Sequence, residues 1–394
     1  MTRILYQDAA LADGRSDTLR LGVSVTVEDG RIIAITEGQE ADPGRDTKVI
    51  DAGGTTIVPG MVDAHSHVTL SGGSHWIDRG LDETEELLGV AEHNAELLNQ
   101  AGVRWARDVG APRRLFNGRE RALSLEVRER WSERRDRPYL RAAGTWLTVS
   151  DFLPAGLTVE VKDGEALLEA ALQQLEEGAD LLKLYLDGPN SDTSPFTAAE
   201  VNRVVENAHE RDAKVTAHTT KLDGARVAAE GRVDSIEHGM ELDRDVARDM
   251  ATHGIALVST LTVLRSWITF GQTTTLPRFA EEEGRLAIQE RYERAQKSVS
   301  IAHSENVAIA AGTDFGGGSA RANQLAWEVE SLVKAGLKPW EGLAAATWRG
   351  GELLGEPDAG VVREGGPADF FLVHGDPLSD PSALWRVWRV AWLD

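Results

Sequence analysis

The fold of this chain is decided at Val58-Pro59-Gly60-Met61-Val62-Asp63-Ala64-His65-Ser66-His67. An apolar run ends there in two histidines separated by one serine. In a β-strand, residues two apart point to the same side, so both imidazoles can face one space at the strand end. A His-X-His pair is a weak signal by itself, because exposed or capping histidines are common and short motifs match by chance.

From Pro59 onward, apolar strand-like runs alternate with amphipathic helical segments. The helix expected within 163–178 has clear boundaries, because Asp163 can cap its N-terminus and Gly178 can close its C-terminus. Alternating strands and helices predict a parallel sheet covered by helices, and eight such strands predict a closed (β/α)8 TIM barrel. The eight expected strands end near His67 or span 102–109, 139–143, 181–186, 214–218, 235–238, 255–259 and 307–314.

Both ends of the chain are rich in residues that favour β-strands. The segment 24–35 places two β-rich runs around Asp29-Gly30, a strong hairpin signal. We predict a small β-sandwich domain built from residues 1–58 and 360–394, beside a barrel of residues 59–359. The returning strands are expected in segments 361–362, 368–373 and 385–390.

Composition excludes several classes of function. The formal net charge is −22, from 64 acidic and 42 basic residues, so nucleic acid and anionic membranes are poor partners. The chain has no cysteine, which excludes thiolate catalysis and leaves nitrogen and oxygen atoms as metal ligands. No secretory signal or apolar run of about 18 residues is visible. We therefore expect a cytoplasmic protein that acts on a small-molecule substrate, and self-association into a homo-oligomer stays open.

Four further polar groups lie at the ends of expected strands. Lys183 interrupts an apolar run, whereas His218, His238 and Asp314 each end one. Alone, each could be a hydrogen-bonded strand terminus, and the lysine could extend its ammonium to solvent. Together with the His-X-His pair they place six metal-competent or modifiable groups on five strands. All five ends belong to the C-terminal face of the barrel, which is where the active sites of such barrels lie.

This constellation resembles the amidohydrolase superfamily, and the resemblance spans nearly the whole chain. It includes the segment 58–67 and the closing Gly366-Pro367-Ala368-Asp369-Phe370-Phe371-Leu372-Val373. The resemblance implies two divalent metal ions, expected to be zinc, although nitrogen and oxygen ligands also suit manganese and similar ions. A strand-4 lysine, carboxylated by carbon dioxide, bridges the two ions in that family. The matching positions here are His65, His67 and Asp314 for the more buried ion, His218 and His238 for the other, and Lys183 for the bridge.

The same resemblance implies a reaction. A metal-bridging hydroxide would attack a polarised carbonyl, and Asp314 would collect its proton and pass it to the leaving amine. The prolidase-like and imidazolonepropionase-related subgroup is the most similar, which predicts cleavage of an amide bond in a dipeptide or an N-acyl amino acid. Tyr185 and His75 are candidate substrate-binding residues, but Tyr185 could equally be a packed aromatic side chain and His75 an exposed loop residue.

Three alternatives differ in chemistry. An ester, lactone or phosphotriester hydrolase could use the same metal centre, because fold and metals do not fix the substrate. A deaminase of the superfamily would carry a glutamate shortly after the strand-5 histidine, whereas Thr219-Thr220-Lys221-Leu222-Asp223 follow His218. A non-catalytic scaffold would show a broken ligand set, and here all six positions are filled.

Overall fold

The computed structural model describes residues 3–38, 46–116, 118–189 and 192–394. Its centre is a closed barrel of parallel strands, made of a three-stranded and a seven-stranded sheet. The bridges Ala143–Leu181 and Ser66–Phe315 join these two sheets at their edges. The predicted fold class and all eight predicted barrel strands are confirmed, with boundaries shifted by a few residues. These strands are β6 (Met61–Ser66), β7 (Val103–Asp108), β10 (Tyr139–Ala142), β13 (Leu181–Tyr185), β14 (Lys214–Thr219), β15 (Ser235–His238), β16 (Ala256–Ser259) and β17 (Ile309–Ala311).

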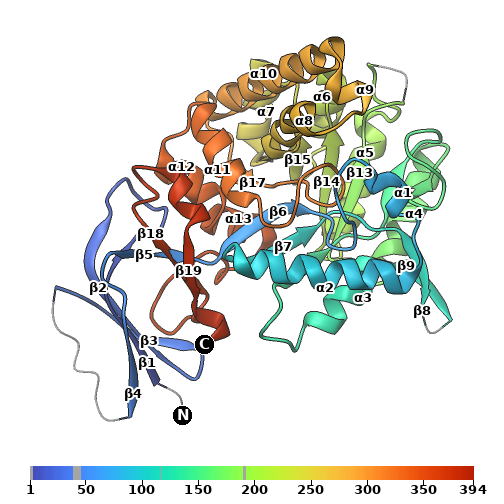
Figure 1. Cartoon of the computed structure of the whole chain (residues 1–394). Coiled ribbons are helices and arrows are strands. Elements are labelled where there is room, and N and C mark those ends of the chain that lie inside the picture. Colours follow the sequence, from blue (N-terminus) through green and yellow to red (C-terminus); the bar gives the residue numbers. More distant parts are fainter. Residues whose placement is uncertain (1–2, 39–45, 117, 190–191) are drawn as a thin grey trace.

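Helices cover the outside of the barrel (Figure 1). Their buried faces are apolar, and the largest apolar core of the molecule lies between them and the strands. The helix predicted within 163–178 is confirmed, since the Asp163 carboxylate accepts a hydrogen bond from the Ala166 backbone N–H at 2.9 Å. The helices are α1 (Trp76–Arg79), α2 (Thr84–Gln100), α3 (Leu123–Trp131), α4 (Gly164–Glu176), α5 (Ala198–His209), α6 (Leu222–Glu230), α7 (Arg244–His253), α8 (Leu261–Thr273), α9 (Pro277–Ala280), α10 (Glu282–Ser304), α11 (Leu325–Lys334), α12 (Pro339–Ala345) and α13 (Trp348–Leu354), with short 3-10 helices at Pro381–Trp385 and Ala391–Leu393.

The two ends of the chain meet in one sheet, in the order β19-β18-β5-β1-β2-β3, with β4 paired to β1. The predicted hairpin forms around Asp29 and Gly30, both of which have a positive φ. The C-terminus lies beside this terminal sheet (Figure 1). Its strands are β1 (Arg3–Leu11), β2 (Arg20–Glu28), β3 (Arg31–Glu37), β4 (Thr47–Asp51), β5 (Thr55–Pro59), β18 (Phe370–His374) and β19 (Val387–Val390).

Gly60 separates the terminal sheet from the barrel. It lies between β5 and β6, where a Cβ atom would come within 2.7 Å of the Arg104 Cβ and 3.1 Å of the Asp369 carbonyl oxygen. No larger side chain fits this close approach without a shift of its neighbours. The first barrel strand therefore continues directly from the terminal sheet, which fixes the position of the His-X-His pair at its far end.

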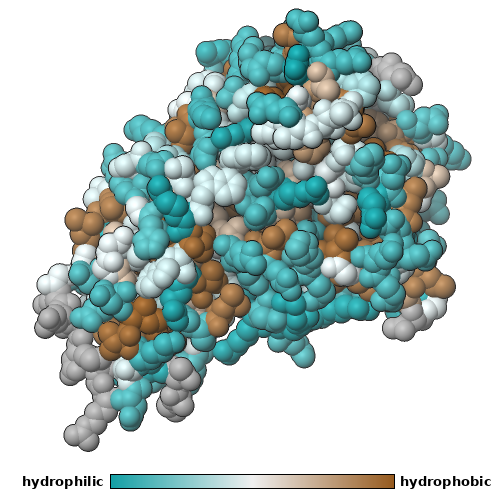
Figure 2. Space-filling model, in the orientation of Figure 1, coloured by the Kyte–Doolittle hydropathy of each residue, from teal (hydrophilic) through white to brown (hydrophobic). Residues whose placement is uncertain are grey.

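Several elements around the barrel were not predicted from the sequence. They include the hairpin of β8 (Arg113–Phe116) and β9 (Arg119–Ala122), and the short strands β11 (Trp146–Thr148) and β12 (Thr158–Glu160). Among the described residues, no helix is both long enough and apolar enough to cross a membrane. On the face shown in Figure 2, hydrophobic residues form small groups separated by hydrophilic ones.

Candidate metal centre

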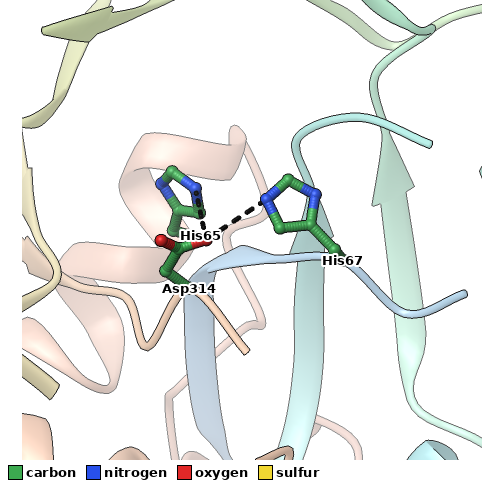
Figure 3. A group of neighbouring side chains, drawn as sticks. All are labelled: His65, His67 and Asp314. Atoms are coloured by element: carbon green, nitrogen blue, oxygen red, sulfur yellow. Dashed lines mark ion pairs between the residues drawn. The ribbon is translucent and has the colours of Figure 1, made fainter. Parts of the chain in front are cut away.

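Three predicted ligands converge at one end of the barrel. His65 lies in β6 and His67 directly follows it, and both imidazoles point toward the Asp314 carboxylate, which follows β17 (Figure 3). The Asp314 Oδ1 atom lies 3.5 Å from the His65 Nε2 and 3.3 Å from the His67 Nε2. A hydrogen bond from the Asp314 backbone N–H to the His65 carbonyl oxygen, 2.9 Å long, closes the barrel at this level.

The hydrogen bonds of the two histidines fix which nitrogen atoms are free. The His67 Nδ1 lies 2.7 Å from the Gly110 carbonyl oxygen, which only accepts, so this nitrogen carries the hydrogen. The His65 Nδ1 lies 2.6 Å from the Glu237 carboxylate and is a donor for the same reason. In the neutral rings, both Nε2 lone pairs then face the Asp314 carboxylate. In that protonation state a metal ion bound between them would satisfy all three acceptors, whereas imidazolium rings would pair with the carboxylate directly.

His218 and His238 lie beside this group. The ring centroids of His218 and His238 are 4.5 Å apart, and those of His65 and His238 are 4.8 Å apart. The His238 Nδ1 contacts the Thr260 hydroxyl at 2.7 Å, which leaves its other nitrogen free. The His218 Nδ1 is buried and has no hydrogen-bond partner among the described residues. These two imidazoles can therefore supply ligands for a second ion next to the first.

Lys183 completes the predicted set from β13. Its side chain is 1% exposed, and its Nζ has no hydrogen-bond partner within the described part of the chain. Burial lowers the pKa of Lys183 to about 8, although the charges of Glu237 and Asp314 oppose this effect. A neutral fraction of the amine is therefore present near pH 7, and only a neutral amine can react with carbon dioxide. Burial, together with the Lys183 charge, also holds the pKa values of His218 and His238 well below the usual range.

Two of the candidate ligands adopt a left-handed backbone conformation. The φ angle is 68° at His238 and 55° at Asp314, a region that non-glycine residues seldom occupy. Asp63 supports this geometry near Asp314, since its carboxylate accepts hydrogen bonds from the Thr313 backbone N–H at 3.0 Å and hydroxyl at 2.6 Å. Strained residues held by such contacts concentrate at functional sites.

The predicted centre opens into one cavity of about 170 Å³. Tyr185 lines this cavity and stacks on His218, with ring centroids 4.2 Å apart and an interplanar angle of 9°. His75 does not line it, because its side chain is 66% exposed and lies 3.8 Å from the Asp78 carboxylate. Five of the six predicted metal ligands and Tyr185 therefore line one cavity, whereas Lys183 is buried without lining it and His75 lies at the surface. The cavity is lined by His65, His67, Trp76, Trp146, Phe152, Leu153, Tyr185, His218, Thr220, His238, Met240, Val263, Trp267, Arg291, Asp314, Gly317 and Gly318.

Comparison with known families agrees with this geometry. A family model described as Amidohydrolase family matches residues 56–390, most of the chain. The chain belongs to the amidohydrolase family. The superfamily predicted from the strand-end ligands is confirmed, and the chain is a hydrolase that acts on carbon–nitrogen bonds.

Several individual proteins are similar to this chain over much of its length. An uncharacterized protein of Mycobacterium tuberculosis is 30% identical over 371 residues, 92% of this chain and 88% of the relative. The ochratoxinase of Aspergillus niger is 28% identical over 251 residues, 58% of this chain and 49% of the relative. An imidazolonepropionase of Idiomarina loihiensis is 23% identical over 392 residues, 92% of this chain and 88% of the relative. A solved Xaa-Pro dipeptidase with bound methionine shares the fold, with a TM-score of 0.84 and 24% identity over 98% of this chain and 97% of that one.

Sequence reasoning missed the residues that support the candidate metal ligands from inside the barrel. Glu237 is fully buried and binds both the His65 imidazole and the Arg107 guanidinium, each at 2.6 Å. Burial raises the pKa of Glu237, but the charges of Arg107, Lys183 and His65 outweigh it and hold this pKa well below the usual range. These two residues could have been found from their charge, because Arg107 and Glu237 interrupt apolar runs in barrel strands. A buried charge inside a barrel requires a partner on a neighbouring strand.

Proposed function

We propose that this amidohydrolase cleaves the amide bond of a dipeptide or an N-acyl amino acid at two divalent metal ions, both zinc, bridged by carboxylated Lys183. One observation carries the proposal: the Nε2 atoms of His65 and His67 converge on the Asp314 carboxylate, whose charge also acts on a buried Lys183 Nζ without a hydrogen-bond partner among the described residues. A carbamate on that nitrogen supplies anionic oxygen atoms where an ammonium would only repel cations. Bound divalent ions would supply a water of lowered pKa and a Lewis acid for the scissile carbonyl.

Two side chains of the protein then transfer the proton and bind the substrate carbonyl. Asp314 accepts the proton of the attacking water and delivers it to the departing amine nitrogen. Burial raises the pKa of Asp314, but His65, His67 and His238 outweigh it and hold the pKa well below the usual range, so the carboxylate is ready to accept. The Tyr185 hydroxyl is the proposed donor to the substrate carbonyl oxygen. Burial raises the pKa of Tyr185 far above neutral, which keeps this donor protonated.

The cavity supports a small substrate. A volume of about 170 Å³ is far too small for a folded polypeptide. The names of two similar proteins, Xaa-Pro dipeptidase and ochratoxinase, also refer to small molecules. A small-molecule partner is therefore part of the proposal, whereas a cytoplasmic location and a homo-oligomeric state stay predictions.

The proposal is tested by Lys183→Ala, with Lys162→Ala as the matched control because the Lys162 side chain is 84% exposed. We expect Lys183→Ala to lose most bound metal and to lower turnover by about two orders of magnitude or more, since the bridging ligand is removed. Lys162→Ala should match the wild type. Metal content is measured by mass spectrometry, and turnover by release of amines from dipeptides and N-acyl amino acids. Full metal content and full turnover in Lys183→Ala would refute the bridging role.

A further inference from the structure

Arg291 brings a positive charge to the wall of the metal-site cavity. It lies on α10, the long helix that follows β16 in the chain and lies at the top of Figure 1. The side chain is partly buried and lines the same cavity as His218 and Asp314. Its Nε donates a hydrogen bond to the Met240 sulfur at 3.2 Å, and its guanidinium lies 5.7 Å from the centre of the Trp267 ring.

The Arg291 charge lacks a direct counter-ion in the described part of the chain. No carboxylate there lies within 4.0 Å of its guanidinium, and neither terminal nitrogen has a hydrogen-bond acceptor. Two carboxylates are close enough to act on the charge, but Glu241 lies 3.9 Å from both the Lys221 and Arg294 side chains, and the carboxylate of Asp187 is already engaged. It accepts hydrogen bonds from the Thr220 backbone N–H at 2.5 Å and hydroxyl at 2.8 Å, and lies 3.6 Å from the His218 Nε2. The two terminal nitrogens of Arg291 are therefore free to bind an anion in the cavity.

The wall beside Arg291 is apolar. Trp267 and Val263 come from α8, while Phe152 and Leu153 come from the segment that precedes β12. The Phe152 ring packs edge-on against Tyr185, with centroids 4.8 Å apart. A cavity with one guanidinium and aromatic walls favours a ligand that carries one negative charge next to an apolar group.

We propose that Arg291 determines specificity by binding the free carboxylate of the substrate, while Phe152, Leu153 and Trp267 receive an apolar side chain next to it. The substrate class is then N-acyl amino acids and dipeptides with a free terminal carboxylate and an apolar final residue. The inference rests on the proposed function and extends it to the leaving group. A planar guanidinium suits this role because it binds a carboxylate through two parallel hydrogen bonds.

A purely structural role for Arg291 would be to hold α10 against Trp267 of α8. In that case the charge itself would not matter, and substitution would lower the affinity for charged and neutral ligands equally. Arg294 provides the matched control, because it lies one turn further along α10 with its side chain 57% exposed and 3.9 Å from the Glu241 carboxylate. Arg291→Met removes the charge and keeps an apolar stem of similar length.

The test measures binding by calorimetry to the metal-loaded full chain, with hydrocinnamate and the neutral hydrocinnamyl alcohol as probes. We expect Arg291→Met to weaken hydrocinnamate binding by about tenfold or more and to change alcohol binding less than about twofold. Arg294→Met should bind both probes as the wild type does. Unchanged hydrocinnamate binding in Arg291→Met, or an equal loss for both probes, would overturn the proposal. Neither probe has an amide bond, so the result does not depend on the proposed reaction, and the metal content of Lys183→Ala does not depend on Arg291.

Discussion

At the scale of single residues, the candidate metal centre depends on atoms that hold the candidate ligands in place. His67 can offer its Nε2 only because Gly110 brings its carbonyl oxygen to the Nδ1. Gly110 has a φ of 143°, and a Cβ atom there would lie 2.3 Å from the Trp146 indole nitrogen. Glycine is therefore required where this carbonyl approaches the histidine. Glu237 has the corresponding function for His65, through a carboxylate in place of a carbonyl.

Glu237→Gln tests whether the Glu237 carboxylate holds His65 in place. We expect zinc affinity to fall about 10- to 100-fold, because the amide orients His65 less firmly and makes it a weaker ligand. The free energy of unfolding should also fall by about 3–5 kcal/mol, since Arg107 loses its buried partner. Competition with a chelator measures the affinity, and urea denaturation measures the stability. Glu210→Gln, with a side chain that is 75% exposed, is the control. Unchanged zinc affinity in Glu237→Gln would show that the His65 orientation does not need this carboxylate.

At the scale of secondary-structure elements, buried Glu328 on α11 joins β16 to the start of α8. Its carboxylate accepts hydrogen bonds from the Ser259 hydroxyl at 2.7 Å and from the backbone N–H groups of Leu261 and Thr262 at 3.1 and 2.7 Å. These N–H groups belong to the first turn of α8 and have no partner within the helix. Glu328 thereby fixes the helix that carries Trp267 into the cavity.

Glu328 gives a stability prediction with a defined sign. Burial raises its pKa in the folded state, so the folded protein holds this proton more tightly than the unfolded chain does. The Glu328 contribution to the free energy of unfolding therefore decreases as pH rises from about 4.3, the ordinary glutamate value, through the raised pKa. Glu328→Gln loses acceptors, so we expect it to be less stable than the wild type by about 1–3 kcal/mol at low pH. This difference in the free energy of unfolding between the wild type and Glu328→Gln should become smaller as pH rises. Urea denaturation of both proteins at several pH values measures the difference. A difference that grows with pH would contradict a raised pKa of Glu328 in the folded protein.

The barrel strands and the candidate ligands at their ends were predictable because periodicity and strand ends are local properties of the sequence. Asp314 and His238 could be placed without knowing their left-handed conformation, since the end of a strand was enough. Arg291 could not be placed, because it comes from a helix within the long segment between β16 and β17, and nothing local shows which side of that helix faces the cavity. The aromatic wall and the inner Arg107–Glu237 pair depend on contacts between strands and loops that are distant in sequence.

At the scale of the whole molecule, β18 connects two separate apolar cores. Phe370 packs in the core of the terminal sheet, whereas Phe371, its neighbour on the opposite face, packs in the core of the barrel. Both side chains are fully buried. The Phe371 ring lies against Gly102 at the start of β7, where a Cβ atom would come within 2.6 Å of the ring. One strand of the terminal sheet therefore contributes side chains to both cores, and we expect the sheet and the barrel to unfold together.

Phe370→Ala and Phe371→Ala form a matched pair that tests this coupling, one substitution in each core. Truncation of a buried phenylalanine costs about 3–5 kcal/mol, so each should lower the melting temperature by several degrees. If the cores are coupled through β18 and the short β5–Gly60–β6 connection, both variants shift the same single transition, and bound metal leaves at that transition. Differential scanning calorimetry with parallel metal-release measurements follows both events. An additional low-temperature transition in Phe370→Ala, with metal still bound above it, would show that the terminal sheet unfolds alone. It would also mean that the His-X-His strand does not depend on the sheet from which it continues.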